Sequence, residues 1–362
     1  MLGLQERPGL IMNREKTKKI NIGDIIIGGD APISIQSMTN TKTTDIEGTI
    51  IQINELITAG CEIIRLAVPD QDSVKALPEI IKASSIPVIA DIHFDYKLAL
   101  GAVASGIDGL RLNPGNIGGF DKVKQVVLAC KDNNIPIRVG VNSGSLDKEI
   151  AKEYGHTPEA MVASAKKHIS YLEELDFTDI IVSLKSSSIM MTLKANQLFT
   201  EKYDYPLHIG ITEAGGGRAG DIKSAAGIGA LLSHGLGDTL RISLTDNPVR
   251  EVEAGIQILK SFGLRDKGIE IISCPTCGRT EIDLLKLSRQ VKTALKDLDL
   301  NLTVAVMGCA VNGPGEASQA DIGIAGGKGV GLIFKKGEII KKVSEDKLLN
   351  ELIAEIKNME CE

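Results

Sequence analysis

The sequence predicts an α/β protein in two parts, an N-terminal (β/α)8 TIM-type barrel and a smaller C-terminal α/β domain. Eight short, apolar, β-rich runs alternate with helical stretches over residues 33–245, and such alternation builds parallel βαβ units. Eight units match the size of a (β/α)8 barrel, whereas a doubly wound sheet more often has five or six strands. After residue 264 the alternation gives way to a different, shorter α/β pattern.

A small hairpin precedes the barrel strands. Residues 18–30, KKINIGDIIIGGD, place Gly23 and Asp24 as a turn between two short apolar runs. We expect this hairpin to close the bottom of the barrel. Residues 1–17 are assigned to an N-terminal arm.

The barrel domain is expected to cover residues 18–264. The runs predicted to form its strands are residues 33–38, 62–68, 86–94, 109–114, 136–142, 179–185, 206–213 and 238–245. The segments between them, such as DIEGTIIQINELITAG, have the apolar spacing of amphipathic helices. Residues 265–362 contain two cysteine-bearing loops, β-rich runs and a last amphipathic helix, and they form the second domain.

Composition excludes several classes of protein. Lys and Arg number 41 against 47 Asp and Glu, a net charge of −6, whereas a general nucleic-acid binder needs a basic surplus. No apolar run approaches the roughly 18 residues of a membrane span, and the N-terminus lacks the apolar core of a secretory signal. We therefore expect a cytoplasmic protein, and in that reducing compartment clustered cysteines indicate metal or redox chemistry.

Five cations lie inside or at the end of the predicted strands. Arg65, Arg111, Arg138 and Arg241 lie inside apolar strands, and Lys185 ends the sixth. Functional side chains of a barrel lie at the C-terminal ends of its strands, so these cations are expected to meet at one mouth. An arginine among aliphatic residues is costly unless it is paired or liganded. Phosphate or diphosphate, which guanidinium groups bind well, is the ligand we predict.

Polar residues accompany these cations. The further candidates are Asp91 and His93 at the end of the third predicted strand, Glu213 at the end of the seventh, and Asn113, Asn142 and Ser243, which the two-residue period of a strand places on the faces of the arginines. The alternative is that the arginines form structural ion pairs with Asp91, Glu213 and other carboxylates.

Three cysteines gather in the second domain. Cys274 and Cys277 form C-P-T-C, and Cys309 lies in GCAVNGPGEA, with Glu316 seven positions later. A structural zinc site usually takes four Cys or His ligands, but His234 is the last histidine of the chain. Three thiolates and an oxygen ligand suit an iron–sulfur cluster that leaves one iron to chemistry. A cluster is favoured, with a zinc site and a redox disulfide as alternatives.

A set of co-linear motifs covers nearly all of residues 18–350: IQSMTNTKTTD, RLAVPD, ADIHFDYKLA, GLRLNPGNIG, IRVGVNSGSL, ITEAGGG, GDTLRISLTDNP, CPTCGR and CAVNGPGEA. With these motifs the chain resembles the bacterial 4-hydroxy-3-methylbut-2-enyl diphosphate synthases of the non-mevalonate isoprenoid pathway. No large insert separates the barrel from the second domain, so the chain looks like the compact two-domain bacterial form.

The resemblance implies a cofactor, a reaction and partners. It implies a 4Fe–4S cluster held by Cys274, Cys277, Cys309 and Glu316. The substrate implied is 2-C-methyl-D-erythritol 2,4-cyclodiphosphate, which a two-electron reductive dehydration opens to (E)-4-hydroxy-3-methylbut-2-enyl diphosphate. The electrons would come from flavodoxin or ferredoxin. The resemblance also implies a head-to-tail homodimer, in which each cluster domain covers the partner's barrel.

The resemblance also suggests residue roles. The substrate is expected to be held by Arg65, Arg111, Arg138, Lys185, Asn113, Asn142 and Ser243, with Asp91 and His93 in the same mouth. Arg241 would join them or orient Glu213, the expected proton donor to the departing hydroxyl. Asn312 would touch the substrate from the cluster side, and Glu316 would yield its place on the iron to a substrate oxygen.

Two functions of other classes remain open. A phosphosugar aldolase or isomerase barrel with a structural zinc domain would use Lys185 as a Schiff-base residue. A cluster-bearing regulatory protein would sense iron or redox state and would not turn over a cyclic diphosphate.

Overall fold

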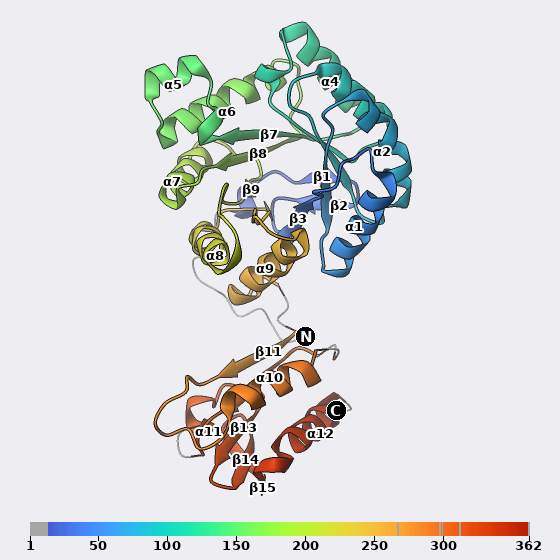
Figure 1. The fold of residues 1–362 in the computed structure, drawn as a ribbon. Helices are drawn as coiled ribbons and strands as arrows, with labels where there is room; N and C mark the ends of the chain where they lie inside the picture. Colours follow the sequence, from blue (N-terminus) through green and yellow to red (C-terminus); the bar gives the residue numbers. More distant parts are fainter. Residues whose placement is uncertain (1–13, 266–267, 297, 299, 311–312, 361–362) are drawn as a thin grey trace. The chain divides into compact units, whose positions relative to one another are not determined.

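The computed structural model describes residues 14–265, 268–296, 298, 300–310 and 313–360 of the chain. It divides into two compact units, the first ending at Arg265 and the second beginning at Asp266 (Figure 1). Among the helices of the described residues, none combines the length and the apolar character that a membrane crossing requires.

In the described residues, eight parallel strands form the barrel of the first unit (Figure 1). They are β3 (Ser34–Met38), β4 (Ile63–Ala67), β5 (Val88–Asp91), β6 (Gly109–Leu112), β7 (Ile137–Asn142), β8 (Ile180–Lys185), β9 (His208–Ile209) and β10 (Thr239–Leu240). Their order in the sheet is β8-β7-β6-β5-β4-β3-β10-β9. A parallel bridge between Val182 and Leu207 joins the two ends of this sheet, so the predicted barrel fold is confirmed.

Several strands are shorter than the sequence predicts. β9 and β10 have two residues each, where residues 206–213 and 238–245 predict longer strands. Glu213 has a φ of 53°, in the left-handed region that a strand does not contain. β5 and β6 end at Asp91 and Leu112. His93 and Asn113 therefore follow their strands instead of lying in them.

Helices cover the outside of the barrel (Figure 1). They are α1 (Ile46–Thr58), α2 (Gln71–Ala83), α3 (Tyr96–Ala104), α4 (Phe120–Asp132), α5 (Lys148–Tyr154), α6 (Pro158–Glu173), α7 (Ile189–Thr200), α8 (Gly217–Ser233) and α9 (Pro248–Ser261), with short 3₁₀ turns at Arg14–Lys16, Pro114–Asn116 and Ser143–Ser145. Asp45, Asp70 and Asp95 accept hydrogen bonds from backbone N–H groups in the first turns of α1, α2 and α3. These N-caps fix where each helix begins after its strand.

An antiparallel hairpin closes the N-terminal end of the barrel. β1 (Ile20–Ile22) pairs with β2 (Ile25–Ile27) around Gly23, whose φ is 57°. Isoleucines of the hairpin and of the strand beginnings form one buried cluster: Ile20, Ile22, Ile27, Ile63, Ile89 and Ile181. The packing between the hairpin and the strand beginnings at this end is therefore apolar.

A buried carboxylate ties the N-terminal segment to the same end. Asp238 is 1% exposed and accepts hydrogen bonds from the Leu207 N–H at 2.7 Å and the Thr17 hydroxyl at 3.1 Å. Nε of Arg14 lies 3.7 Å from its Oδ1. Burial raises the pKa of Asp238 to about 6. The arm is thus packed on the barrel from Arg14 onward, and residues 1–13 lie outside the described residues.

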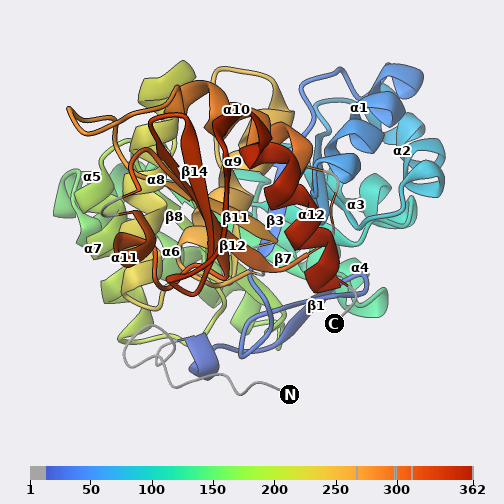
Figure 2. The same cartoon turned by 90° about the horizontal axis from the view of Figure 1, so that it is seen from below.

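The second unit is a mixed sheet with helices. Its strands are β11 (Ile269–Ser273), β12 (Leu302–Met307), β13 (Ile322–Gly327), β14 (Val330–Lys335) and β15 (Glu338–Ser344), in that order; its helices are α10 (Leu284–Ala294), α11 (Gly313–Glu316) and α12 (Leu348–Glu360), with a 3₁₀ turn at Glu345–Lys347. β11, β12 and β13 are parallel, and the last three are antiparallel. α10 and α12 pack on one face of this sheet (Figure 2).

The Asp238 carboxyl predicts a pH-dependent term in the stability of the barrel. Its pKa is about 6 in the folded chain against roughly 3.9 when unfolded. The term is therefore fully present below about pH 4 and is lost as the pH rises through about 6, by roughly 3 kcal/mol at most. Asp238→Asn removes it. We expect the free energy of unfolding of the barrel, wild type minus variant, to fall between pH 4.5 and 7 in urea titrations. A difference that stays constant or grows with pH would contradict this assignment.

Candidate functional site

The five predicted cations lie close enough together for their charges to influence one another. Cα register pairs Arg111 with Arg138 and Asn142 with Lys185 on neighbouring strands. Burial lowers the pKa of Lys185 well below its ordinary value, and the positive charges of all four arginines, Arg138 first, lower it further. Since each arginine acts on Lys185, the structure brings together cations that lie far apart in the sequence.

Asp91 pairs with two of the arginines. Nη1 of Arg111 donates to its Oδ1 at 3.0 Å, and Nε of Arg65 lies 3.6 Å from its Oδ2. Nε2 of the exposed His93 lies 3.7 Å from Oδ1. Burial alone would raise the pKa of Asp91, but the His93 hydrogen bond and the charges of Arg65 and Arg111 hold it below its ordinary value. Asp91 is therefore ionised and holds both guanidinium groups in place.

Arg241 pairs with Glu251, the fourth residue of α9. Nε and Nη2 of Arg241 each lie 3.3 Å from Oε2 of Glu251, whose Oε1 accepts a hydrogen bond from the Leu244 N–H at 2.9 Å. Glu213 is exposed and has no ion pair among the described residues. The structure therefore does not support the expectation that Arg241 orients Glu213. Glu251 cannot be identified from the sequence, because it lies on a helix and carries no motif.

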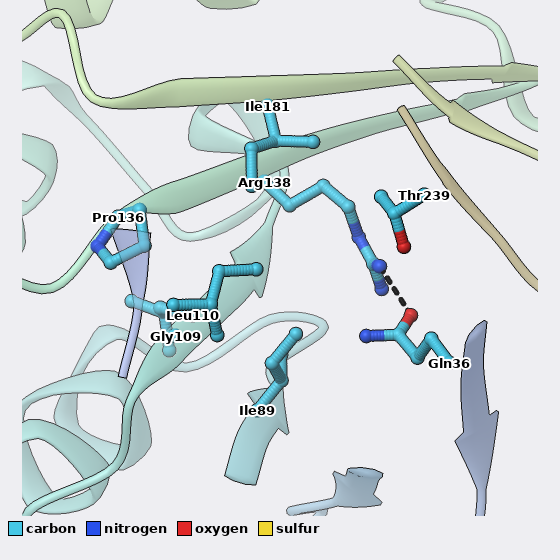
Figure 3. A pocket seen from close by; sticks show the side chains of 9 residues that line it. Gln36, Ile89, Gly109, Leu110, Pro136, Arg138, Ile181 and Thr239 are labelled. Carbon is cyan, nitrogen blue, oxygen red and sulfur yellow. Dashed lines mark hydrogen bonds between the residues drawn. The ribbon is translucent and has the colours of Figure 1, made fainter. Parts of the chain in front are cut away.

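Arg138 is buried deepest of the five cations, at the second position of β7. It is 3% exposed, and its Nη1 donates to Oε1 of Gln36 (Figure 3). Its Nε and Nη2 have no partner among the described residues. A cavity of about 10 Å³, room for about one water, lies beside it and is lined by Gln36, Thr239 and Ile181 among others. Buried N–H donors of a guanidinium need acceptors, and a cavity of this size has room for a water molecule but not for a diphosphate.

His208 was missed in the sequence analysis. It is 1% exposed at the start of β9, and neither ring nitrogen has a partner among the described residues. Burial lowers the pKa of His208 well below its ordinary value, and the charges of Lys185 and Arg138 lower it further. The imidazole is therefore neutral and can accept a hydrogen bond. The two-residue period of strand side chains, applied to β9, could have identified His208 from the sequence.

Two glycines make room for two of the cations. A Cβ at Gly140 would lie 3.0 Å from both Nε and Nη2 of Arg111. A Cβ at Gly210 would lie 2.9 Å from Nζ of Lys185 and 2.5 Å from the Arg241 carbonyl oxygen. Neither glycine has a positive φ. Space therefore requires glycine at 210, where a Cβ would meet a backbone oxygen, while a Cβ at 140 would press on the Arg111 guanidinium.

The predicted polar residues are placed around this cation-lined mouth. Oδ1 of the buried Asn113 accepts a hydrogen bond from the Gly140 N–H at 3.0 Å, which leaves the amide nitrogen for a ligand. Asn142 ends β7, Ser243 follows β10, and both are half-buried. Asn312 lies outside the described residues.

The cysteine loops of the second unit follow two neighbouring parallel strands. β11 leads to Cys274 and β12 to Cys309, and the two strands pair in register. The Gly308 N–H donates to Sγ of Cys274 at 3.2 Å, and the Glu281 N–H donates to the Gly308 carbonyl at 3.0 Å. These hydrogen bonds join the two loops, so that both cysteine segments lie at one end of the sheet.

The three thiols of the second unit have the chemistry that ligands of a metal ion or cluster require. Hydrogen bonds to the exposed Cys277 thiol from the backbone of Arg279, and to a lesser extent from its side chain, lower the pKa of this thiol. Metals bind the thiolate form of cysteine. Cys274, Cys277 and Cys309 are free thiols. Within the described residues, no three Cys, His, Asp or Glu side chains lie close enough to hold a metal ion. The Glu316 side chain lies outside the described part of the chain.

The remaining described cysteines are inert. Cys61 and Cys130 are buried in the barrel domain, and burial raises the pKa of each thiol to about 12. Neither lies in the second unit, so they do not add to the ligand set.

Two sequence models of one family match this chain. The GcpE TIM-barrel domain matches residues 17–256, and the GcpE protein C-terminal domain matches residues 270–358. Curated relatives named 4-hydroxy-3-methylbut-2-en-1-yl diphosphate synthase (flavodoxin) are similar over nearly their whole length. The relative from Clostridium perfringens is 57% identical, over 94% of this chain and 98% of its own. Those from Thermodesulfovibrio yellowstonii and Geobacter sulfurreducens are 57% and 56% identical, over 96% of this chain and 100% and 99% of theirs.

A solved structure of another enzyme shares the barrel alone. The 3-dehydroquinate dehydratase of Geobacillus kaustophilus matches with a TM-score of 0.50 and 15% identity, over 70% of this chain and 99% of its own. At that identity the similarity indicates the fold and nothing about the activity.

The close approach of Arg111 to Gly140 predicts the effect of one added methyl group. Gly140→Ala must displace the Arg111 guanidinium, and we expect its Kd for inorganic diphosphate, measured by calorimetry, to rise about tenfold or more, a loss of about 1.4 kcal/mol. Gly144→Ala is the matched control, because a Cβ there meets nothing within 4 Å. Equal affinities in the two variants would refute the placement of the ligand beside Arg111.

Proposed function

Because this chain belongs to the GcpE family of 4-hydroxy-3-methylbut-2-en-1-yl diphosphate synthases, we propose that its barrel binds the cyclic diphosphate and its second domain holds a 4Fe–4S cluster. The enzyme is a flavodoxin-dependent oxidoreductase of isoprenoid biosynthesis. It converts 2-C-methyl-D-erythritol 2,4-cyclodiphosphate to (E)-4-hydroxy-3-methylbut-2-enyl diphosphate by a two-electron reductive dehydration with ring opening. The family does not support the alternative of a phosphosugar aldolase or isomerase.

Excess positive charge in the barrel is the observation that supports this substrate site. In the described residues the five cations of the mouth pair with two carboxylates, Asp91 and Glu251. The cations outnumber the carboxylates by three, and Arg138 and Lys185 have no carboxylate partner among the described residues. A diphosphate ester supplies several negative oxygens at once, and arginine forks bind such oxygens in pairs.

The residues of the mouth divide into binding and positioning groups. The diphosphate oxygens are bound by Arg65, Arg111, Arg138, Lys185, Asn113, Asn142 and Ser243, with His93 at the rim. Asp91 positions Arg65 and Arg111, and Glu251 positions Arg241. His208 remains neutral beside Lys185 and accepts a hydrogen bond from the ligand-bound network.

Glu213 is the proposed proton donor to the departing hydroxyl. It lies between β9 and α8 with a φ of 53°, and non-glycine residues held in this region are frequent at functional sites. Its carbonyl accepts a hydrogen bond from Nζ of Lys223 at 3.1 Å. An exposed carboxyl on a loop after a barrel strand can reach the carbon skeleton while the arginines hold the phosphates.

The proposed cluster is held by Cys274, Cys277 and Cys309, with Glu316 as the fourth ligand and Asn312 near the substrate. The joined loops and the lowered pKa of Cys277 support this assignment. When bound, the cluster passes the two electrons one at a time. Thiolate ligands stay reduced in the cytoplasm, which is where we place the enzyme.

The proposed reaction is tested anaerobically with the full chain, the cyclic diphosphate and reduced flavodoxin. We expect the allylic diphosphate as product, and iron with acid-labile sulfide in the purified protein. Glu213→Gln should bind substrate as before but turn over about 10² to 10⁴ times more slowly, the usual size of a lost proton transfer. Stoichiometric zinc without sulfide would refute the cluster, and normal turnover of Glu213→Gln would refute its role.

We also propose that the active form is a head-to-tail homodimer, in which the barrel of one chain works with the cluster domain of its partner. The contacts that hold the last residue of the barrel domain, Arg265, support this arrangement. Nη2 of Arg265 donates to Oε2 of Glu62 at 2.6 Å, and that oxygen also accepts from the Ile35 N–H at 2.8 Å. These residues lie at the N-terminal ends of β3 and β4. The chain therefore leaves the barrel domain at the end opposite the cation-lined mouth.

A tagged heterodimer tests this arrangement. One chain carries Arg138→Ala and the other Cys309→Ala, so each chain alone lacks one part of the site. If the parts combine across the dimer, the heterodimer has one intact site of two and should show about half of the wild-type rate. Each variant homodimer serves as the inactive control. A heterodimer as inactive as the controls would show that each chain uses its own two domains.

A further inference from the structure

Helix α10 presents an unpaired basic face to solvent. Its Leu284 and Val291 are buried against the sheet. Leu285, Arg289 and Lys292 are exposed, and their spacing of four and three residues puts them in one stripe. Neither Arg289 nor Lys292 forms an ion pair among the described residues, and α10 contains no acidic residue. Leu285, 62% exposed, adds an apolar contact at one end of this stripe.

The stripe begins beside the cysteine loops. A Cβ at Gly308 would lie 3.3 Å from Cδ2 of Leu284, and the Gly308 N–H donates to Sγ of Cys274. The first turn of α10 therefore packs on the loop that leads to Cys309. Arg289 and Lys292 follow Leu285 by about 6 and 10 Å of helix rise. A protein docked on this stripe would lie next to the proposed cluster.

The other side of α10 has the opposite character. A groove of about 660 Å³ runs there, lined by Lys286 and Gln290 and by three acids, Asp283, Glu345 and Asp346. These acids disfavour an acidic partner over the groove. On α10, the surface that favours such a partner is therefore the stripe of Leu285, Arg289 and Lys292.

The favourable effect of cations on helix stability accounts for only one of the two basic residues of the stripe. Lys292 lies in the last turn, where a cation interacts favourably with the helix dipole. Arg289 lies in the middle of α10, where the dipole gives it little. An exposed apolar side chain next to two like charges is instead suited to a weak, short-lived protein encounter, as in electron transfer.

We propose that Leu285, Arg289 and Lys292 form the docking surface for an acidic face of the flavodoxin that reduces this enzyme, an inference that rests on the proposed function. Complementary charge raises the rate of encounter, and salt screens it. Docking on the first half of the second domain would bring the donor to the cysteine loops while the cation-lined mouth of the barrel takes the anionic substrate.

The test compares two charge reversals in the cluster-loaded full chain. Arg289→Glu/Lys292→Glu changes the stripe, and Lys82→Glu/Lys124→Glu is the matched control, because both lysines are exposed on α2 and α4 without ion pairs among the described residues. Both pairs change the net charge by the same amount. Turnover of the cyclic diphosphate is measured at low and high salt, with reduced flavodoxin and, separately, with dithionite and methyl viologen.

We expect the stripe variant to raise the KM for flavodoxin about tenfold or more at low salt and to lose most of the salt dependence. Its rate with methyl viologen should stay within about twofold of the wild type, and the control should behave as the wild type throughout. An unchanged KM, or an equal rise in the control, would overturn the proposal. If the reversal loses the cluster absorbance, Arg289→Gln/Lys292→Gln replaces it, and an unchanged KM there also overturns it. Failure of the proposed function would appear differently, as no turnover by the unmodified chain with methyl viologen.

Discussion

Uncompensated positive charge inside the barrel is the constraint on which the rest of this structure depends. Burying an ion costs several kcal/mol of desolvation free energy, which oppositely charged or hydrogen-bonded partners can offset. Asp91 and Glu251 offset part of it for Arg65, Arg111 and Arg241, while two N–H donors of Arg138 have no partner in the part of the chain that the structure describes. The scaffold must hold these groups apart and in place without a ligand. The isoleucine cluster at the hairpin end, and the absence of side chains at Gly140 and Gly210, supply that rigidity and that room.

The two units divide the chemistry by the kind of group each can stabilise. A closed parallel barrel directs the C-terminal ends of its strands to one mouth, which suits convergent cations. Thiolate ligands instead need accessible loops and hydrogen-bond donors, and the second unit provides both at the ends of β11 and β12. In the function that we propose, the guanidinium groups of the barrel bind the anionic substrate, and in the second unit the Gly308 N–H donates to the sulfur of Cys274.

Much of this could be predicted from the sequence, because periodicity and position carry it. The alternation of apolar runs and helices predicts the barrel, which the structure confirms, and the arginines within apolar strands predict the anion site that we propose. Contacts between distant elements could not be predicted in this way. Glu251 is the partner of Arg241 through the packing of α9, and Gln36 meets Arg138 across the barrel. His208 looked like an ordinary residue of an apolar run. β9 and β10 are short because Glu213 and the polar residues after each strand depart from extended pairing.

Thermal unfolding of the intact chain with inorganic diphosphate tests the central claim most directly. If the barrel cations form a diphosphate site, ligand at a hundred times its Kd stabilises the fold by about 2.7 kcal/mol. For a domain of this size that raises Tm by roughly 5 to 10 °C. Sulfate at equal ionic strength should give a clearly smaller rise, because it offers one anionic centre. A Tm that diphosphate leaves unchanged, or raises no more than sulfate does, would contradict the account.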